Sequence, residues 1–105
     1  EIFWGKDKKN WDLSLINKFF LDKTVYITFD VDGFDASIMP ATGTPEPGGL
    51  LWEEVLPIIK KVCKISNVVG ADINELAPIK NFDSYNFLVA KLAYKILAYT
   101  FEFKN

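Results

Sequence analysis

The 105-residue chain contains no histidine and no arginine, and it contains a single cysteine. Without histidine the chain cannot complete a Ser-His-Asp or Cys-His catalytic group, or a zinc site with histidine ligands. The single cysteine, Cys63, excludes an internal disulfide bond and a metal site made of several thiolates. Because Cys63 falls among the apolar positions of an expected helix, we expect a buried, unreactive side chain.

Long apolar runs and blocks of like charge are also absent. Lys91 and Lys95 interrupt the longest apolar stretch, from Phe87 to Tyr99, well before the roughly 18 residues of a membrane span. Twelve lysines face fourteen acidic residues, for a net charge of -2. We therefore expect no membrane anchor and no nucleic-acid partner.

The first residues show neither an initiator methionine nor the basic start and apolar stretch of a signal peptide. We expect a cytoplasmic protein, and the missing methionine indicates a fragment. Half of the residues are hydrophobic and a quarter are charged, which is ordinary globular composition. At this length one modest core can form, so residues 1–105 are expected to make a single domain.

Two segments are typical of β-strands. Residues Thr24 to Phe29 alternate β-branched and aromatic side chains and lead into a turn that contains glycine, and Val68 to Asp72 repeats the pattern more briefly. Ile2 to Trp4 is a third candidate, at the edge of a sheet.

Helical spacing of apolar residues predicts three helices between and after these strands. The first is Trp11 to Leu21, the second includes Leu51 to Val62, and the third follows a cap at Asp83 or Ser84. Pro57 predicts a kink in the second helix or a later start. The buried stripe expected for the third helix comprises Phe87, Leu88, Leu92, Ile96 and Leu97.

Strands and helices thus alternate along the chain. This order predicts an α/β fold with three α/β/α layers, in which helices cover both faces of a mainly parallel sheet. The 19-residue segment from Val31 to Gly49 is longer than the two to six or so residues that usually join a strand to a helix. Loops of that length are often functional, and ligands of α/β sheets collect beyond the carboxyl ends of strands.

Asp30 and Asp32 lie where the first strand gives way to this loop. In extended chain their side chains project to the same side, so two carboxylates can converge on a cation such as Mn²⁺, Mg²⁺ or Ca²⁺. The alternative is that these acids stabilise the turn through hydrogen bonds to the backbone.

Glu75 follows the second strand at the same edge of the sheet. Its carboxylate suits a guanidinium group through two parallel hydrogen bonds, and the alternative is a solvated loop acid. Asp35, Glu46 and Asp72 are explained by turn formation or helix capping.

Two segments make the chain recognisable. Residues Thr28 to Gly49, TFDVDGFDASIMPATGTPEPGG, resemble a long motif of the ureohydrolase family, the arginases and agmatinases. The run GTPEPGG looks more like an agmatinase than an arginase. Residues Val69 to Pro78, VGADINELAP, are similar to the later Asp-x-x-Glu segment of the family.

The resemblance implies an arginase-like α/β/α fold and two Mn²⁺ ions bridged by hydroxide, which hydrolyse agmatine to putrescine and urea. Asp30 and Asp32 match metal ligands of the family and thereby take part in catalysis. Glu75 matches the acid that holds the substrate guanidinium, and Thr44 matches a threonine that lines the substrate site.

In the family the remaining ligands come from earlier segments that contain histidine. The chain therefore resembles the C-terminal part of a ureohydrolase, and we expect the fragment alone to be inactive and the full-length protein to be a homo-oligomer. Three alternatives stay open: an arginase or another ureohydrolase of guanidino substrates, a non-catalytic truncated fragment, and a phosphatase of the haloacid dehalogenase type. The last is suggested by Ile27 to Gly33, ITFDVDG.

Overall fold

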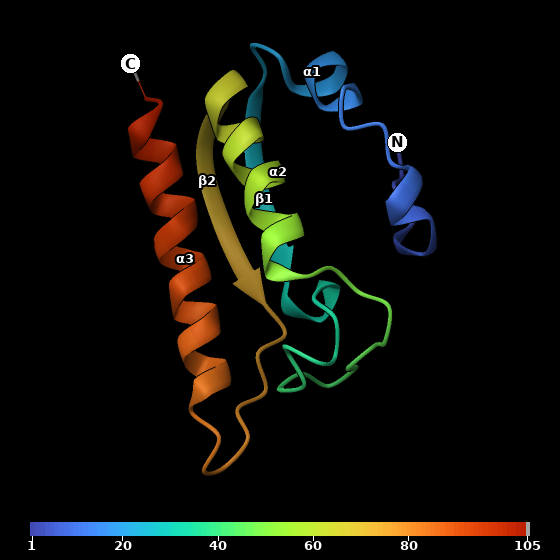
Figure 1. Cartoon of the computed structure of the whole chain (residues 1–105). Coiled ribbons are helices and arrows are strands. Elements are labelled where there is room, and N and C mark those ends of the chain that lie inside the picture. Colours follow the sequence, from blue (N-terminus) through green and yellow to red (C-terminus); the bar gives the residue numbers. More distant parts are fainter. Residues whose placement is uncertain (105) are drawn as a thin grey trace.

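The structure is a computed structural model that describes residues 1–104 and belongs to the α/β class (Figure 1). Its elements are, in chain order, η1 (Gly5–Asn10), α1 (Leu15–Phe20), β1 (Thr24–Asp30), η2 (Val31–Gly33), α2 (Trp52–Ile65), β2 (Asn67–Asn74) and α3 (Ser84–Glu102), where η denotes a 3-10 helix. The described residues contain no helix that is long and apolar enough to cross a membrane.

β1 and β2 pair in parallel, as the alternation of strands and helices predicts. The register runs from Thr24 opposite Asn67 to Asp30 opposite Asn74. It shifts by one residue between Val25 and Tyr26. The two strands therefore end level with each other at their carboxyl ends, and the irregularity lies near the opposite end.

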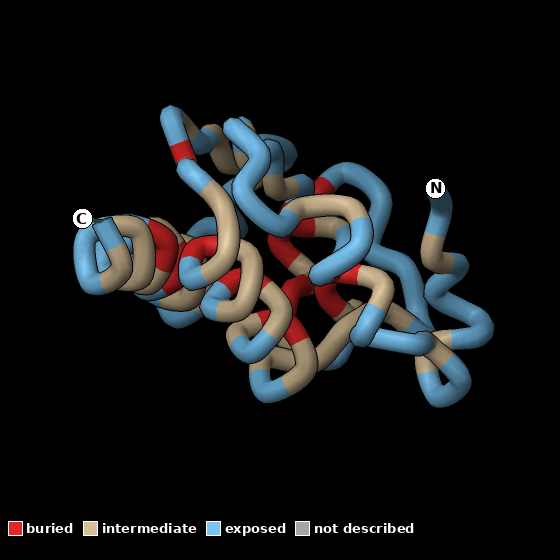
Figure 2. Tube along the Cα trace, turned by 90° about the horizontal axis from the view of Figure 1, so that it is seen from above, coloured by how far each residue is buried: buried red, intermediate tan, exposed pale blue. Residues whose placement is uncertain are grey.

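One face of this sheet carries the core. Along β1, half-buried and exposed residues alternate, which is the period-two pattern of a strand with one covered face. The half-buried side chains of β1 pack against the buried core cluster, to which both α2 and α3 contribute residues. Figure 1 shows α2 in front of the two strands and α3 alongside β2. Figure 2 shows most of the buried segments in the middle of the molecule, with exposed ones around them. The opposite face of the sheet is exposed within residues 1–104, as Tyr26 at 60% accessibility illustrates.

The expected edge strand at Ile2 to Trp4 is wrong. No strand pairs there within the described residues; these residues have no regular secondary structure, and the 3-10 helix η1 begins directly after Trp4. The Trp4 carbonyl accepts hydrogen bonds from the Asp7 amide at 2.9 Å and from the Trp11 indole at 2.9 Å. These local bonds occupy an acceptor that a sheet would need. The following helix is also shorter than expected, with six residues in α1.

Pro57 does not delay the start of α2, which begins at Trp52 and runs through the proline. A proline in the sixth position removes one backbone hydrogen bond, to the carbonyl of Glu53. The Leu51 amide donates to the Glu54 carboxylate at 2.8 Å, which helps to start the helix ahead of the proline.

The stripe expected for α3 is only partly right. Leu92 and Ile96 are buried and Leu88 is half-buried, but Phe87 and Leu97 are exposed at 71% and 57%. A helix that is apolar on most sides does not reveal from its spacing which side faces the core. As expected, Cys63 is buried, and burial raises the pKa of its thiol.

Candidate functional site

The carboxyl end of β1 places the first pair of acids. Asp30 is the last residue of the strand and is exposed, Val31 is fully buried, and Asp32 is half-buried in η2. The extended geometry expected between the two acids is wrong, because the strand stops at Asp30. The Phe34 amide donates to the Val31 carbonyl at 3.2 Å and closes the 3-10 turn. The buried Val31 and Phe34 thus anchor the turn that presents Asp32.

Thr44, from the long loop, lies against this turn. Its hydroxyl donates to the Asp32 carboxylate at 2.7 Å. A hydrogen bond of this length to an ionised acceptor helps to hold Asp32 in one orientation. The structure therefore brings together Asp32 and Thr44, which the sequence separates by 12 residues.

Glu75 lies at the same edge of the sheet. Asp30 and Asn74 are register partners, so Glu75 stands one residue beyond the level of Asp30. Its backbone has a φ of 72°, in the left-handed region that non-glycine residues avoid. Such conformations persist where the surrounding structure enforces them, and they cluster at functional sites. The Glu75 side chain is exposed, and the ion pairs found within residues 1–104 do not involve it.

The loop is fastened to the segment that follows Glu75. Thr42 and Leu76 form an isolated antiparallel bridge, and the Ala77 amide donates to the Ala41 carbonyl at 2.8 Å. Ala41 and Thr42 are buried. Thr44 and Glu75 lie on either side of this junction. The contacts therefore hold the loop segment that carries Thr44 against the segment that carries Glu75.

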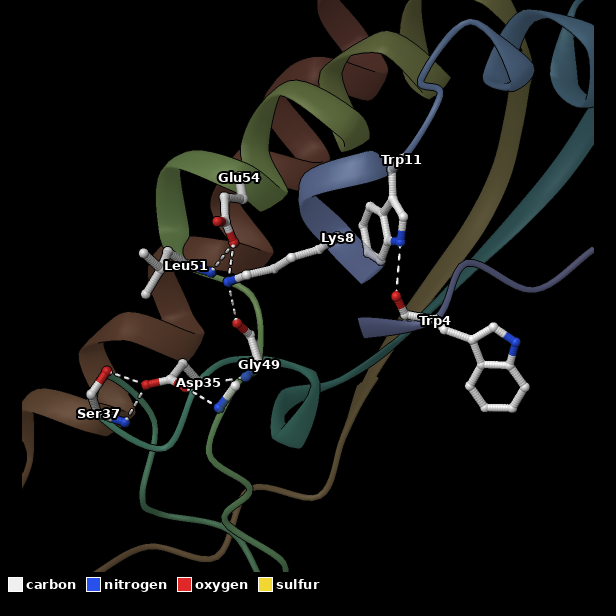
Figure 3. A network of polar contacts seen from close by, with 9 residues as sticks. Trp4, Lys8, Trp11, Asp35, Ser37, Gly49, Leu51 and Glu54 are labelled. Atoms are coloured by element: carbon white, nitrogen blue, oxygen red, sulfur yellow. Dashed lines mark hydrogen bonds and ion pairs between the residues drawn. The ribbon is translucent and has the colours of Figure 1, made fainter. Parts of the chain in front are cut away.

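Asp35 closes the loop upon itself, as Figure 3 shows. Its carboxylate accepts hydrogen bonds from the Gly48 amide at 2.7 Å, from the Gly49 amide at 3.1 Å, and from both the amide and the hydroxyl of Ser37. These bonds, those of Ser37 above all, lower the pKa of Asp35 to about 2. Turn formation, the expectation for Asp35, is confirmed.

Lys8, which the sequence patterns do not single out, ties η1 to the base of this loop (Figure 3). Its ammonium group donates to the Gly49 carbonyl at 2.8 Å and to the Glu54 carboxylate at 3.1 Å. The Leu51 amide donates to the same carboxylate. The bond from Leu51 and then that from Lys8 lower the pKa of Glu54. Lys8 precedes Gly49 by 41 residues, and no pattern in a single sequence predicts a contact between two residues so far apart.

The Asp35 carboxylate makes the stability of the fold depend on pH. Because its pKa is lower in the folded chain than in the unfolded one, its contribution is present above about pH 4 and is lost as the pH falls toward 2. We expect Asp35→Ala to reduce the loss of stability between pH 5 and 2, roughly the window set by these two pKa values. Urea unfolding midpoints at each pH measure this.

Glu46→Ala is the matched control, because Glu46 is an exposed acid of the same loop. It should keep the pH dependence of the unaltered chain. An unchanged pH dependence in Asp35→Ala would contradict the assigned role of Asp35.

The expectation for Asp72 is wrong. It lies inside β2, not in a turn or at a helix start, and its carboxylate accepts hydrogen bonds from Thr28 Oγ1 at 2.7 Å and Asn74 Nδ2 at 2.5 Å. The bond from Thr28 is the largest cause of a lowered Asp72 pKa. If the two predicted strands are paired in parallel with their carboxyl ends level, Thr28 lies beside Asp72. The sequence therefore contained the information needed to predict this hydrogen bond.

The acids at this edge of the sheet fit a manganese ion only in part. Asp30 and Asp32 provide the hard oxygen ligands that Mn²⁺ accepts. Within residues 1–104, however, no group of three or more His, Cys, Asp or Glu side chains lies close enough to hold a metal ion. The chain therefore offers part of a ligand set for such an ion and does not complete one.

Comparison with known proteins agrees with the resemblance of the two sequence segments to the ureohydrolase family. The sequence matches the model of the arginase family over residues 7–99. It is 42% identical over 101 residues to N(1)-aminopropylagmatine ureohydrolase of Synechocystis sp., covering 93% of this chain and 33% of that protein. It is 44% identical over 77 residues to the mitochondrial agmatinase of Gallus gallus, covering 72% of this chain and 22% of that protein.

Among solved structures, agmatine ureohydrolase of Thermoplasma volcanium superposes with a TM-score of 0.72 at 34% identity. That match covers 90% of this chain and 32% of the other. The chain thus spans about a third of the length of the Synechocystis relative and of this structure. The family model covers nearly the whole chain, and the fold agrees, so this protein belongs to the arginase family.

Proposed function

We propose that the full-length polypeptide carrying this chain hydrolyses agmatine to putrescine and urea at the carboxyl edge of the sheet. The observation that carries the proposal is the gathering of Asp30, Asp32, Thr44 and Glu75 at that edge, from two strands and a loop. The agmatinases and agmatine ureohydrolases among its relatives support the choice of substrate.

In this proposal Asp30 and Asp32 hold manganese. The Asp32 carboxylate keeps its orientation through the bond from Thr44, which leaves its other oxygen for a metal ion. Two Mn²⁺ ions would lower the pKa of a bound water and so supply a nucleophile near neutral pH. Ligands beyond the described residues complete the site, and we propose that these 105 residues alone do not turn over substrate.

Glu75 and Thr44 face the substrate in this proposal. The exposed Glu75 carboxylate, on a residue with a left-handed backbone, can accept two parallel hydrogen bonds from a guanidinium. Holding the planar group in this way orients its central carbon toward the metal carboxylates. Glu75 then binds the substrate, whereas Asp30 and Asp32 hold the metal ions that activate water.

A second candidate substrate, N(1)-aminopropylagmatine, is supported by the names of several relatives. The relative that aligns over 93% of this chain is an N(1)-aminopropylagmatine ureohydrolase, and three further relatives carry that name. Both substrates present a guanidino group to Glu75 and differ in what extends from the far amine. A phosphatase of the haloacid dehalogenase type is not supported, because residues 7–99 match the arginase family.

The test compares kcat/KM for agmatine, N(1)-aminopropylagmatine, arginine and formimidoylglutamate, using the full-length polypeptide loaded with Mn²⁺. We expect agmatine to be the best substrate. A higher kcat/KM for N(1)-aminopropylagmatine selects the second candidate, and urea release from arginine alone overturns both.

A further inference from the structure

A polar cluster on the exposed face of the sheet is not used by the roles assigned so far. Asp72, half-buried in β2, accepts hydrogen bonds from Thr28 across the sheet and from Asn74 two residues along its own strand. Asn74 Nδ2 also lies 3.5 Å from the Thr28 hydroxyl. Three side chains from two strands therefore share one hydrogen-bonded cluster, and none of the three belongs to the hydrophobic core.

The cluster lies on the same two strands as the candidate site, a few residues before their carboxyl ends. Thr28 precedes Asp30 by two residues, Asp72 precedes Glu75 by three, and Asn74 is the register partner of Asp30. Any slip between the strands at this point changes the separation between the metal carboxylates and the acid that receives the guanidinium.

The covered face of β1 fixes which of its side chains point toward the core, but it leaves the outer face of the sheet to be held by other contacts. The pairing is irregular between Val25 and Tyr26, and residues on the outer face of β1 are exposed, so burial does not pin them. A cross-strand hydrogen bond between directly paired side chains stabilises the register of the two strands at that point. The bond from Thr28 to Asp72, at 2.7 Å, joins register partners near the functional end of the sheet.

We propose that Thr28 and Asp72 are positioning residues, whose hydrogen bond fixes the separation between Asp30 and Glu75 and so aligns the guanidino group with the metal carboxylates. This inference rests on the proposed function. The Thr28 hydroxyl donates, the ionised Asp72 accepts, and neither group touches the substrate. Misplacing reacting groups by about 1 Å can cost on the order of a hundredfold in rate.

A merely structural bond would predict a different pattern. It would lower the free energy of unfolding and leave kcat/KM of the folded protein unchanged. The positioning role predicts a loss of kcat/KM at temperatures where the variant is fully folded, with bound manganese retained. These two readouts separate the interpretations.

The test uses the full-length polypeptide with Thr28→Val, which keeps the shape of the side chain and removes the donor. We expect kcat/KM for agmatine to fall roughly tenfold or more, in line with the loss of a supporting partner, at unchanged manganese content. Thr28→Ser should restore most of kcat/KM. Thr24→Val is the matched control, since Thr24 is exposed on the same strand and face but at the irregular end, and it should stay within about twofold.

Hydrogen exchange of the same variants gives a readout that does not need turnover. In Thr28→Val, backbone amides of residues 28–32 and 72–76 should exchange about tenfold faster, while those of 24–26 keep their rates. Unaltered kcat/KM together with unaltered exchange in Thr28→Val overturns the positioning role, as does an equal loss in Thr24→Val. If the unaltered protein releases no urea, the proposed function is overturned, and the exchange result alone decides whether the bond sets the register.

Discussion

Asp32→Ala and Asp30→Ala are each expected to lower bound manganese and to reduce urea release by roughly a hundredfold or more in the full-length polypeptide. Both variants remove one of the few oxygen donors at the edge of the sheet, and Asp32→Ala also leaves the Thr44 hydroxyl without its partner. Glu75→Ala should behave differently. It should keep its manganese and lose about 2–5 kcal/mol of substrate binding, because the guanidinium loses its charged partner.

Metal analysis of the purified variants, together with KM and kcat, separates these roles. Glu46→Ala serves as the control, because this exposed acid of the same loop should change neither quantity. A metal-depleted Glu75→Ala protein would show that Glu75 is a ligand. Full manganese content in both aspartate variants would remove Asp30 and Asp32 from the metal site.

Gly49→Ala is expected to destabilise the fold by about 3 kcal/mol, the upper end for overpacking at a rigid site. A Cβ at Gly49 would lie 2.6 Å from the Asp35 amide nitrogen and 2.6 Å from the Phe34 carbonyl carbon. Both are backbone atoms, so no side chain can swing aside. The same residue also donates to Asp35 and accepts from Lys8, and a displaced backbone would weaken both bonds.

Gly43→Ala is the matched control, since it lies in the same loop and a Cβ there meets no atom within 4 Å. It should leave the urea unfolding midpoint nearly unchanged. An equally stable Gly49→Ala protein would contradict the tight packing of the loop base against Phe34.

The parts of the fold that the sequence predicts are those with a strong local period. Thr24 to Phe29 alternates so regularly that both β1 and its covered face follow from the pattern, and the acids at its end are then placed at the edge of the sheet. The pairing of Thr44 with Asp32 does not follow in the same way. It depends on how a 12-residue stretch of loop folds back, and glycine and proline in a loop do not encode that path.

The errors have physical causes of the same kind. Ile2 to Trp4 has the composition of a strand, but strand formation needs a partner, and the Trp4 carbonyl finds local donors instead. Phe87 and Leu97 are apolar and exposed, because α3 is apolar on more sides than the described residues cover. Asp72 ends the predicted strand Val68 to Asp72, where turn formation is expected, but β2 continues to Asn74 and Thr28 donates to Asp72 across the sheet.

The most direct test follows agmatine labelled with ¹³C in its guanidino carbon, by NMR, in the presence of the manganese-loaded full-length polypeptide. We predict that labelled urea accumulates together with an equal amount of putrescine, and that Asp32→Ala slows both roughly a hundredfold. Persistence of labelled agmatine with the manganese-loaded, folded protein, or urea formation at an equal rate by Asp32→Ala, would contradict guanidine hydrolysis at the edge formed by Asp30, Asp32, Thr44 and Glu75.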